Sequence, residues 1–307
     1  MTTCPKLVDA GVVKEGFLNL IDFVLCDCDG VLWNGEEPIP GSAETINILK
    51  NKGKKVFLVT NNGTKTRDQY ANKCKKYGIN ISADEIFTSG YALSFYLQSK
   101  KFEKKAYILG SVALQEELNK MGISSLPVGP EPMSSTWTDY IENVTLDPEV
   151  GAVIACLDEQ FNFLKLLKAC SYLRNSDCLF LATNIDEAFP VIKNLIVPGT
   201  GPVVAAINNV TKRNPIICGK PYNPIFEAIQ SSHPDLNPNK CIMIGDRLDS
   251  DILLGKNNNL KTLLVLTGTH NLEDIEELKK SKKFEEQNLV PDYYIQSLGE
   301  LGKLLKL

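Results

Sequence analysis

Short apolar runs rich in β-branched residues alternate along this chain with longer amphipathic segments, and this alternation is its most restrictive feature. Such short runs without a polar face are typical of strands that are buried on both sides, as in parallel sheets covered by helices. We therefore expect an α/β fold with a doubly wound parallel sheet. The expected strands are Phe23–Cys26, Lys55–Val59, Ala106–Leu109, Ala152–Cys156, Cys178–Ala182, Ile216–Cys218, Cys241–Ile244 and Thr262–Leu266.

The amphipathic segments between these runs are predicted helices. They are Ser42–Asn51, Thr66–Tyr77, Phe161–Arg174, Asn223–Ser231 and Ser250–Lys256. A length of 307 residues allows two domains, or one domain with a large insertion. Proline and glycine gather between residues 126 and 148 and again between 198 and 202, which predicts long loops in the middle third.

Charge and cysteine usage restrict the partners and the compartment. With 33 Lys+Arg against 37 Asp+Glu, the chain has no global positive field for nucleic acid or anionic lipid. No apolar run is long enough to cross a bilayer, and the N-terminus lacks a basic region followed by an apolar stretch. The nine cysteines have no paired C-x-x-C spacing, which favours reduced, buried thiols. We expect a soluble, cytoplasmic protein that binds neither nucleic acid nor membranes.

Two carboxylates follow the first expected strand, in the run FVLCDCDGV. Ligands of an open parallel sheet bind outside the carboxyl ends of its strands. Asp27 and Asp29 are two residues apart, so in an extended chain both carboxylates, or one carboxylate and a nearby carbonyl, face one cation. On its own, D-x-D-G is equally typical of a strand-end turn with Asx hydrogen bonds.

Polar residues follow three further strands. Thr60, Asn61 and Asn62 supply a hydroxyl and amides suited to phosphate oxygens, although a polar turn before a helix has the same composition. Lys220 in ICGKP is suited to neutralising a phosphoryl group, but a lysine at such a place is more often on the surface. CIMIGDRLDSDI is an apolar strand that ends at Asp246, with Asp251 soon after, although acidic residues at the start of a helix are also common for capping and dipole reasons.

Taken together and in this order, the four motifs resemble those of the haloacid dehalogenase superfamily of phosphotransferases. DCDGVLW, VTNN, ATNIDEAFP, PGTGP, GKP and GDRLDSDILLG are similar to the branch that contains 4-nitrophenyl phosphatases, phosphoglycolate phosphatase and pyridoxal phosphate phosphatase. The resemblance covers nearly the whole chain. It implies a Rossmann-like core with an inserted α/β cap of the large, C2 type. Because two motifs precede the middle third and two follow it, we expect a discontinuous core of residues 1–87 and 210–307 and a cap of residues 88–209.

The resemblance also implies roles for individual residues. Asp27 is expected to be the nucleophile that forms an aspartyl phosphate, and Asp29 the general acid and then base. Mg²⁺ is expected to bind the Asp27 and Asp246 carboxylates and the Asp29 backbone carbonyl, with Asp251 supporting this shell. The residues expected to bind and neutralise phosphate are Thr60, Asn61, Asn62 and Lys220.

The cap is expected to decide which phosphomonoester is hydrolysed. Relatives that prefer pyridoxal phosphate carry a histidine where this chain has Phe189, so we place phosphoglycolate and similar small phosphorylated acids ahead of pyridoxal phosphate and sugar phosphates. Core packing explains Phe189 equally well. We expect 4-nitrophenyl phosphate to be an artificial substrate.

Two other classes of function stay open at this point. A phosphoacceptor of the response-regulator type also uses strand-end aspartates, a threonine and a lysine, although the chain length and the late G-D-x-x-x-x-D motif argue against it. A catalytically inactive binding protein is the other alternative, although all the expected catalytic residue types are present. Relatives with this cap commonly form homodimers through it, and the resemblance implies the same here.

Overall fold

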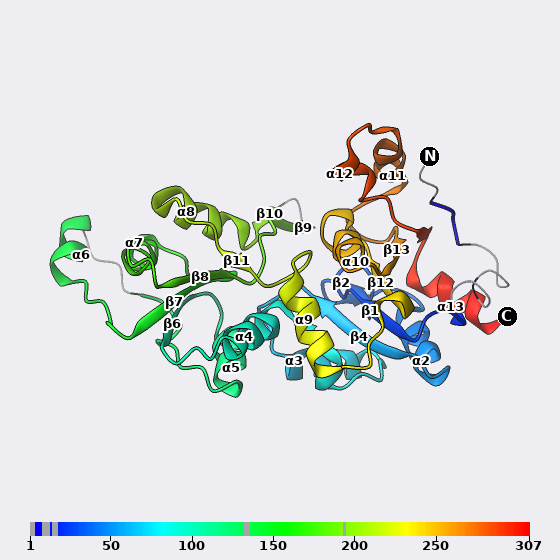
Figure 1. The fold of residues 1–307 in the computed structure, drawn as a ribbon, viewed down its shortest axis with the longest axis horizontal. Helices are drawn as coiled ribbons and strands as arrows, with labels where there is room; N and C mark the ends of the chain where they lie inside the picture. Colours follow the sequence, from blue (N-terminus) through cyan, green and yellow to red (C-terminus); the bar gives the residue numbers. More distant parts are fainter. Residues whose placement is uncertain (1–3, 8–12, 14–17, 132–135, 193–194) are drawn as a thin grey trace. The chain divides into compact units, whose positions relative to one another are not determined.

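The computed structural model describes residues 4–7, 13, 18–131, 136–192 and 195–307 (Figure 1). The chain divides into two compact units. The first contains Met1–Thr60, Arg67–Phe87 and Lys220–Leu307, and the second contains Asn61–Thr66 and Thr88–Gly219. Each unit is built around its own sheet.

The first unit contains a six-stranded sheet in the order β14-β13-β12-β1-β4-β5. Its strands are β1 (Phe23–Cys26), β4 (Lys55–Thr60), β5 (Ile86–Thr88), β12 (Cys241–Gly245), β13 (Lys261–Val265) and β14 (Tyr293–Ile295). The central strand β1 pairs in parallel with β4 on one side and with β12 on the other. All four residues of β1 are buried, as expected for a strand that is covered on both faces. The carboxyl ends of β1, β4 and β12 therefore share one edge of the sheet.

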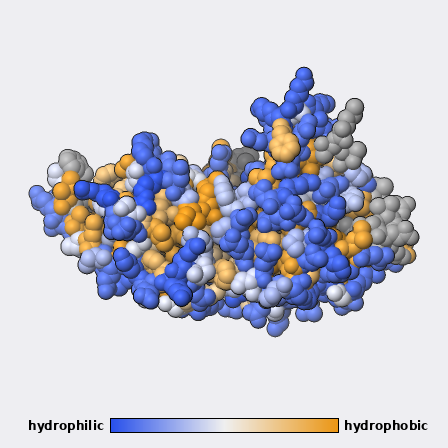
Figure 2. All heavy atoms as spheres, viewed as in Figure 1, coloured by the Kyte–Doolittle hydropathy of each residue, from blue (hydrophilic) through white to orange (hydrophobic). Residues whose placement is uncertain are grey.

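Helices cover this sheet, and the face of the first unit seen in Figure 2 carries mostly hydrophilic side chains with apolar ones scattered among them. The helices are α2 (Ser42–Asn51), α3 (Arg67–Lys76), α9 (Asn223–Ser232), α10 (Leu253–Asn257), α11 (Leu272–Lys280), α12 (Phe284–Gln287) and α13 (Leu298–Lys306). Helices α2 and α13 pack closely because Gly302 leaves room for Thr45, whose hydroxyl donates to the Leu298 carbonyl at 3.0 Å. A hairpin of β2 (Trp33–Asn34) and β3 (Glu37–Pro38) follows the turn after β1.

The second unit contains a four-stranded parallel sheet in the order β11-β8-β7-β6 and an antiparallel hairpin. The strands are β6 (Lys105–Leu109), β7 (Val150–Ala155), β8 (Leu179–Ala182) and β11 (Ile216–Ile217), with β9 (Ala188–Ile192) and β10 (Leu195–Pro198) in the hairpin. The helices are α4 (Ser89–Ser99), α5 (Val112–Lys120), α6 (Trp137–Asn143), α7 (Phe163–Tyr172) and α8 (Gly201–Thr211). The core between sheet and helices includes Phe180, Val153 and Ile207.

The expected α/β fold with parallel sheets is confirmed, and each expected strand is present with small shifts at its ends. The helix expected at Ser250–Lys256 was partly wrong: a π-helical turn, Leu248–Ile252, precedes α10. Strands β5 and β14, helix α13 and the β9–β10 hairpin are present in addition to the expected elements. No helix in the described part of the chain is long and apolar enough to cross a membrane.

Candidate active site

The candidate site of the first unit lies where β1, β4 and β12 end. Asp27 directly follows β1, and its backbone N–H donates to the Ile244 carbonyl of β12 at 2.9 Å. Thr60 is the last residue of β4, and Asp246 directly follows β12. These are neighbouring strands of one parallel sheet, so the polar residues that follow them come together although they are far apart in sequence.

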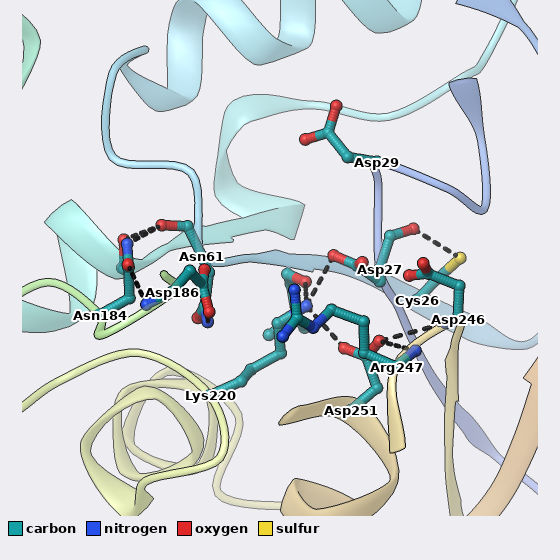
Figure 3. Close-up of polar contacts among 12 residues, drawn as sticks. Cys26, Asp27, Asp29, Asn61, Asn184, Asp186, Lys220, Asp246, Arg247 and Asp251 are labelled. Carbon is teal, nitrogen blue, oxygen red and sulfur yellow. Dashed lines mark hydrogen bonds and ion pairs between the residues drawn. The ribbon is translucent and has the colours of Figure 1, made fainter. Parts of the chain in front are cut away.

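Lys220 lies between the carboxylates of Asp27 and Asp251. Its Nζ lies 2.6 Å from Oδ1 of Asp27 and 2.7 Å from Oδ1 of Asp251, and it donates to the Val59 carbonyl at 2.8 Å. Figure 3 shows the ammonium between the two carboxylates. The Lys220 side chain is only 2% exposed. Burial by itself lowers its pKa, but Asp251 and Asp27 outweigh burial and raise the pKa above its ordinary value. Lys220 is therefore a buried cation and not the surface residue that its sequence context usually indicates.

The Asp251 side chain is fixed by backbone hydrogen bonds from the loop after β12. Its Oδ2 accepts hydrogen bonds from the backbone N–H groups of Asp246 at 3.1 Å and Arg247 at 3.0 Å. A side chain at position 245 would collide with Asp251, so Gly245 is required for this approach. One oxygen of Asp251 thus fixes the backbone of the Asp246 loop, and the other pairs with Lys220.

Asp246 presents an unsatisfied oxygen to the site. Its Oδ2 accepts from the Thr269 N–H at 2.7 Å, whereas its buried Oδ1 has no hydrogen-bond partner among the described residues. One carboxylate oxygen from each of Asp27, Asp246 and Asp251 lies within 4.8 Å of the others. A buried oxygen without a donor, next to two further carboxylates, is the environment expected of a cation ligand.

Burial raises the pKa of all three carboxyl groups in this cluster. Burial raises the pKa of Asp27 to about 7 even though Lys220 acts in the opposite direction. Burial, with Asp251 beside it, raises the pKa of Asp246 to about 6, and burial raises that of Asp251 to about 6. Three carboxylates with one ammonium fit a hard divalent cation, which binds oxygen ligands and favours the ionised forms.

Asp29 is oriented differently from the other three aspartates. Its half-buried carboxylate points away from Asp27 (Figure 3), and its Oδ1 accepts a hydrogen bond from Trp33 Nε1 at 3.0 Å. Between the two aspartates, burial and then Asp27 raise the pKa of the Cys28 thiol well above its ordinary value. A thiol that keeps its proton is consistent with an inert packing residue.

The predicted phosphate-binding motif is divided between the two units. Thr60 belongs to the first unit, is 2% exposed and hydrogen-bonds to Tyr70. Asn61 and Asn62 belong to the second unit, where Asn61 Nδ2 donates to Asp186 at 3.3 Å.

The Asn61 carbonyl is fixed as well. It accepts hydrogen bonds from the Ser89 hydroxyl at 2.7 Å and from Asn184 Nδ2 at 2.8 Å, and Figure 3 shows Asn184 beside Asn61. The backbone of Phe189 lies in β9 opposite Val197, and its side chain lies outside the described part of the structure.

Comparison with known proteins identifies the family. A family model described as haloacid dehalogenase-like hydrolase matches residues 24–124, and a second model of HAD-like hydrolases matches residues 217–301. The glycerol-3-phosphate phosphatase of Rattus norvegicus is 38% identical over an alignment of 289 positions that covers 92% of this chain and 90% of that protein. The chain belongs to the haloacid dehalogenase-like hydrolases. The family predicted from the sequence is thereby confirmed.

Other relatives match over almost their full length. Phosphoglycolate phosphatase 2 of Arabidopsis thaliana is 38% identical over an alignment of 310 positions that covers 98% of this chain and 99% of that protein. The crystal structure of a 4-nitrophenylphosphatase from Thermotoga maritima superposes with a TM-score of 0.76 at 28% identity, covering 93% of this chain and 98% of that one.

Sequence reasoning missed two contacts of this haloacid dehalogenase-like site. The Thr269 N–H that binds Asp246 comes from the segment LTGTH, which follows an expected strand, so the rule applied to the other strand ends would have found it. Gly268 allows this approach, because a side chain there would collide with Asp246. The bond from Trp33 to Asp29 has no such signal, because it depends on the turn at residues 29–33.

Proposed function

We propose that this haloacid dehalogenase-like hydrolase is a Mg²⁺-dependent phosphatase that hydrolyses small phosphomonoesters through an aspartyl phosphate on Asp27. The observation that carries the proposal is the pairing of Asp27 with the buried ammonium of Lys220, beside the unsatisfied Oδ1 of Asp246. A nucleophile, a fixed cation and a cation site at one sheet edge are what phosphoryl transfer needs. Relatives named as phosphatases of glycerol 3-phosphate and phosphoglycolate support the reaction class.

The metal ion would be held by the carboxylates of Asp27 and Asp246 and by the backbone carbonyl of Asp29, with Asp251 supporting them. Oxygen ligands and a small number of protein donors favour Mg²⁺ over Zn²⁺. When bound, the ion neutralises charge on the phosphoryl oxygens. Lys220 provides a second, permanent positive charge at the nucleophile.

The protein's own residues carry the two chemical steps. An Oδ of Asp27 attacks phosphorus, the bond from phosphorus to the substrate oxygen breaks, and Asp29 gives that oxygen a proton. Asp29, now ionised, takes a proton from a water molecule that attacks the aspartyl phosphate. The phosphorus bond to Asp27 breaks, inorganic phosphate leaves, and both carboxyl groups return to their starting forms. We assign the binding of phosphate oxygens to Thr60, Asn61 and Asn62.

We propose that residues 1–87 and 210–307 act as the catalytic core and that residues 88–209 act as a cap that selects the substrate. The Arabidopsis relative supports phosphoglycolate as the first candidate, and the rat relative supports glycerol 3-phosphate as a second. Phe189 is proposed as a specificity residue that disfavours pyridoxal phosphate. Steady-state kcat/KM with these three compounds tests the order, and a large preference for pyridoxal phosphate would refute it.

The experiment that tests the reaction uses Asp27→Asn, which keeps the size of the side chain but removes the nucleophile. With Mg²⁺ and 4-nitrophenyl phosphate, we expect wild-type turnover and a loss of at least about a thousandfold in kcat for the variant. Brief exposure of wild type to substrate followed by acid quenching is expected to trap phosphate on Asp27. A variant that kept its Mg²⁺-dependent rate would contradict the mechanism.

Two further proposals concern the protein's surroundings. All nine cysteines are free thiols, which supports a reducing compartment such as the cytoplasm.

We also propose a homodimer formed through the cap, supported by the exposed apolar side chains of Leu195 and Ile196 in β10, which are 65% and 76% exposed. Light scattering of the purified protein tests this; a monomer at all accessible concentrations would exclude the dimer.

A further inference from the structure

Trp33 is packed on several sides within the first unit. Its side chain is fully buried. The ring of Tyr70 stacks on it with centroids 6.2 Å apart, and the ring of Tyr77 lies 5.8 Å away. Lys73 Nζ lies 4.4 Å from the centre of the indole ring and donates to the Gly35 carbonyl at 2.7 Å. Helix α3 and the residue after it thus fix the indole in one orientation.

The indole N–H is directed at Asp29, the residue proposed as the general acid and base. Trp33 Nε1 donates to Oδ1 of Asp29 at 3.0 Å, and the backbone N–H of Gly30 donates to the Trp33 carbonyl at 2.8 Å. The side chain and the backbone of Trp33 therefore both close the turn that carries Asp29. This contact is one of those that hold the carboxylate in the orientation seen in Figure 3.

An indole N–H only donates hydrogen bonds. An oxygen that accepts from it must keep a lone pair directed at it whether or not the carboxyl group is protonated. The carbonyl oxygen of a carboxylic acid is a better acceptor than its hydroxyl oxygen, so the indole N–H favours the protonated form of Asp29 in which Oδ1 is the carbonyl oxygen and Oδ2 carries the proton. The rigid packing of Trp33 therefore fixes which carboxyl oxygen of Asp29 carries the proton and where that oxygen points.

We propose that Trp33 is a positioning residue for proton transfer: it holds Oδ1 of Asp29, so that Oδ2 carries the proton given to the leaving oxygen and later taken from water. The inference rests on the proposed phosphatase function, which it deepens. In the first step the proton moves from Oδ2 to the substrate oxygen as its bond to phosphorus breaks. In the second step a water proton moves to Oδ2 as the new bond to phosphorus forms.

The test compares two substrates that differ in their need for a proton. The leaving group of an alkyl phosphate such as glycerol 3-phosphate is a strongly basic alkoxide unless it is protonated. The leaving group of 4-nitrophenyl phosphate, 4-nitrophenolate, is a stable anion without a proton. Trp33→Phe removes the N–H and keeps an aromatic ring. We expect kcat/KM to fall at least about tenfold for the alkyl phosphate and less than about threefold for 4-nitrophenyl phosphate. Asp29→Asn is expected to show the same selectivity, with a larger loss.

Tyr77→Phe is the matched control, because it keeps the ring beside Trp33 and leaves the indole N–H in place. Its kcat/KM for both substrates is expected to stay within about twofold of wild type. Equal losses for both substrates in Trp33→Phe, or no loss, would overturn the proposal, because a residue that only packs does not distinguish leaving groups.

A second variant covers the case in which Trp33→Phe does not fold. In a Trp137→Phe background, replacement of the remaining tryptophan by its benzothiophene isostere exchanges N–H for sulfur and keeps the ring shape. The same selective loss is expected, and an unselective result overturns the proposal. Failure of the proposed function is distinguishable, because wild type would then hydrolyse neither substrate with Mg²⁺.

Discussion

Lys220→Met removes the only side-chain cation that the described ion pairs place beside Asp27 and Asp251. The methionine has a similar length, so the main change is electrostatic. Both carboxylates lie almost entirely out of contact with water, and breaking a buried ion pair by removing one partner costs about 3–5 kcal/mol. For a unit of this size such a loss lowers the unfolding temperature by roughly 10 °C.

The loss is expected to depend on pH. The folded-state pKa of Asp27 is about 7 and that of Asp251 about 6, above the ordinary value of 3.8. Removal of Lys220 raises both further, because the ammonium favours the ionised forms. Above these pKa values the buried charges carry their full cost. As the pH falls through them, the folded state takes up protons that the unfolded state does not hold, so stability is regained. The variant should therefore be least stable relative to wild type near about pH 8.5 and recover towards about pH 5.

The assay is thermal unfolding followed by calorimetry from pH 5 to 8.5 in EDTA, so that no metal replaces the lost cation. Lys220→Met/Asp251→Asn is the control, because it also removes one of the unpaired charges. We expect it to be more stable at high pH than the single variant. A loss of the same size at every pH, or no recovery in the double variant, would refute the electrostatic reasoning.

Two further substitutions test the metal site of the first unit and a buried ion pair of the second unit. Gly30→Ala would place a Cβ 2.6 Å from the Asp246 carboxyl carbon, so we expect the Mg²⁺ concentration for half-maximal activity to rise at least about tenfold. Gly35→Ala is the control, because Gly35 also has a positive φ but has open space around it. We expect this variant to leave the Mg²⁺ concentration for half-maximal activity unchanged. In the second unit, Lys165→Met leaves the buried Asp158 without its partner at 2.7 Å, and we expect a loss of about 3–5 kcal/mol in the free energy of unfolding by urea. Unchanged stability there would mean that the pair contributes nothing.

The structure differs from the sequence-based prediction at the helix expected over Ser250–Lys256, where a π-helical turn precedes α10. Its apolar and polar spacing predicts an ordinary helix, but the N–H groups of Asp251 and Ile252 both donate to the Arg247 carbonyl, at 3.1 Å each. The wider turn places Asp251 under Gly245 and beside Lys220. Lys220 is distant in sequence, so local periodicity contains no information about this contact. The amphipathic helix α13, by contrast, had a readable pattern and was overlooked.

The sequence by itself determined the order of buried strands and the sheet edge where Asp27, Thr60 and Asp246 meet, and the family followed from the resemblance of its motifs. It could do so because each strand is specified by a short apolar run and because parallel strands end on one side. Only the tertiary structure decided that Lys220 is buried between two carboxylates and that Trp33 holds Asp29. Those contacts join side chains through turns and neighbouring strands, and their distances depend on packing in three dimensions rather than on any pattern along the chain.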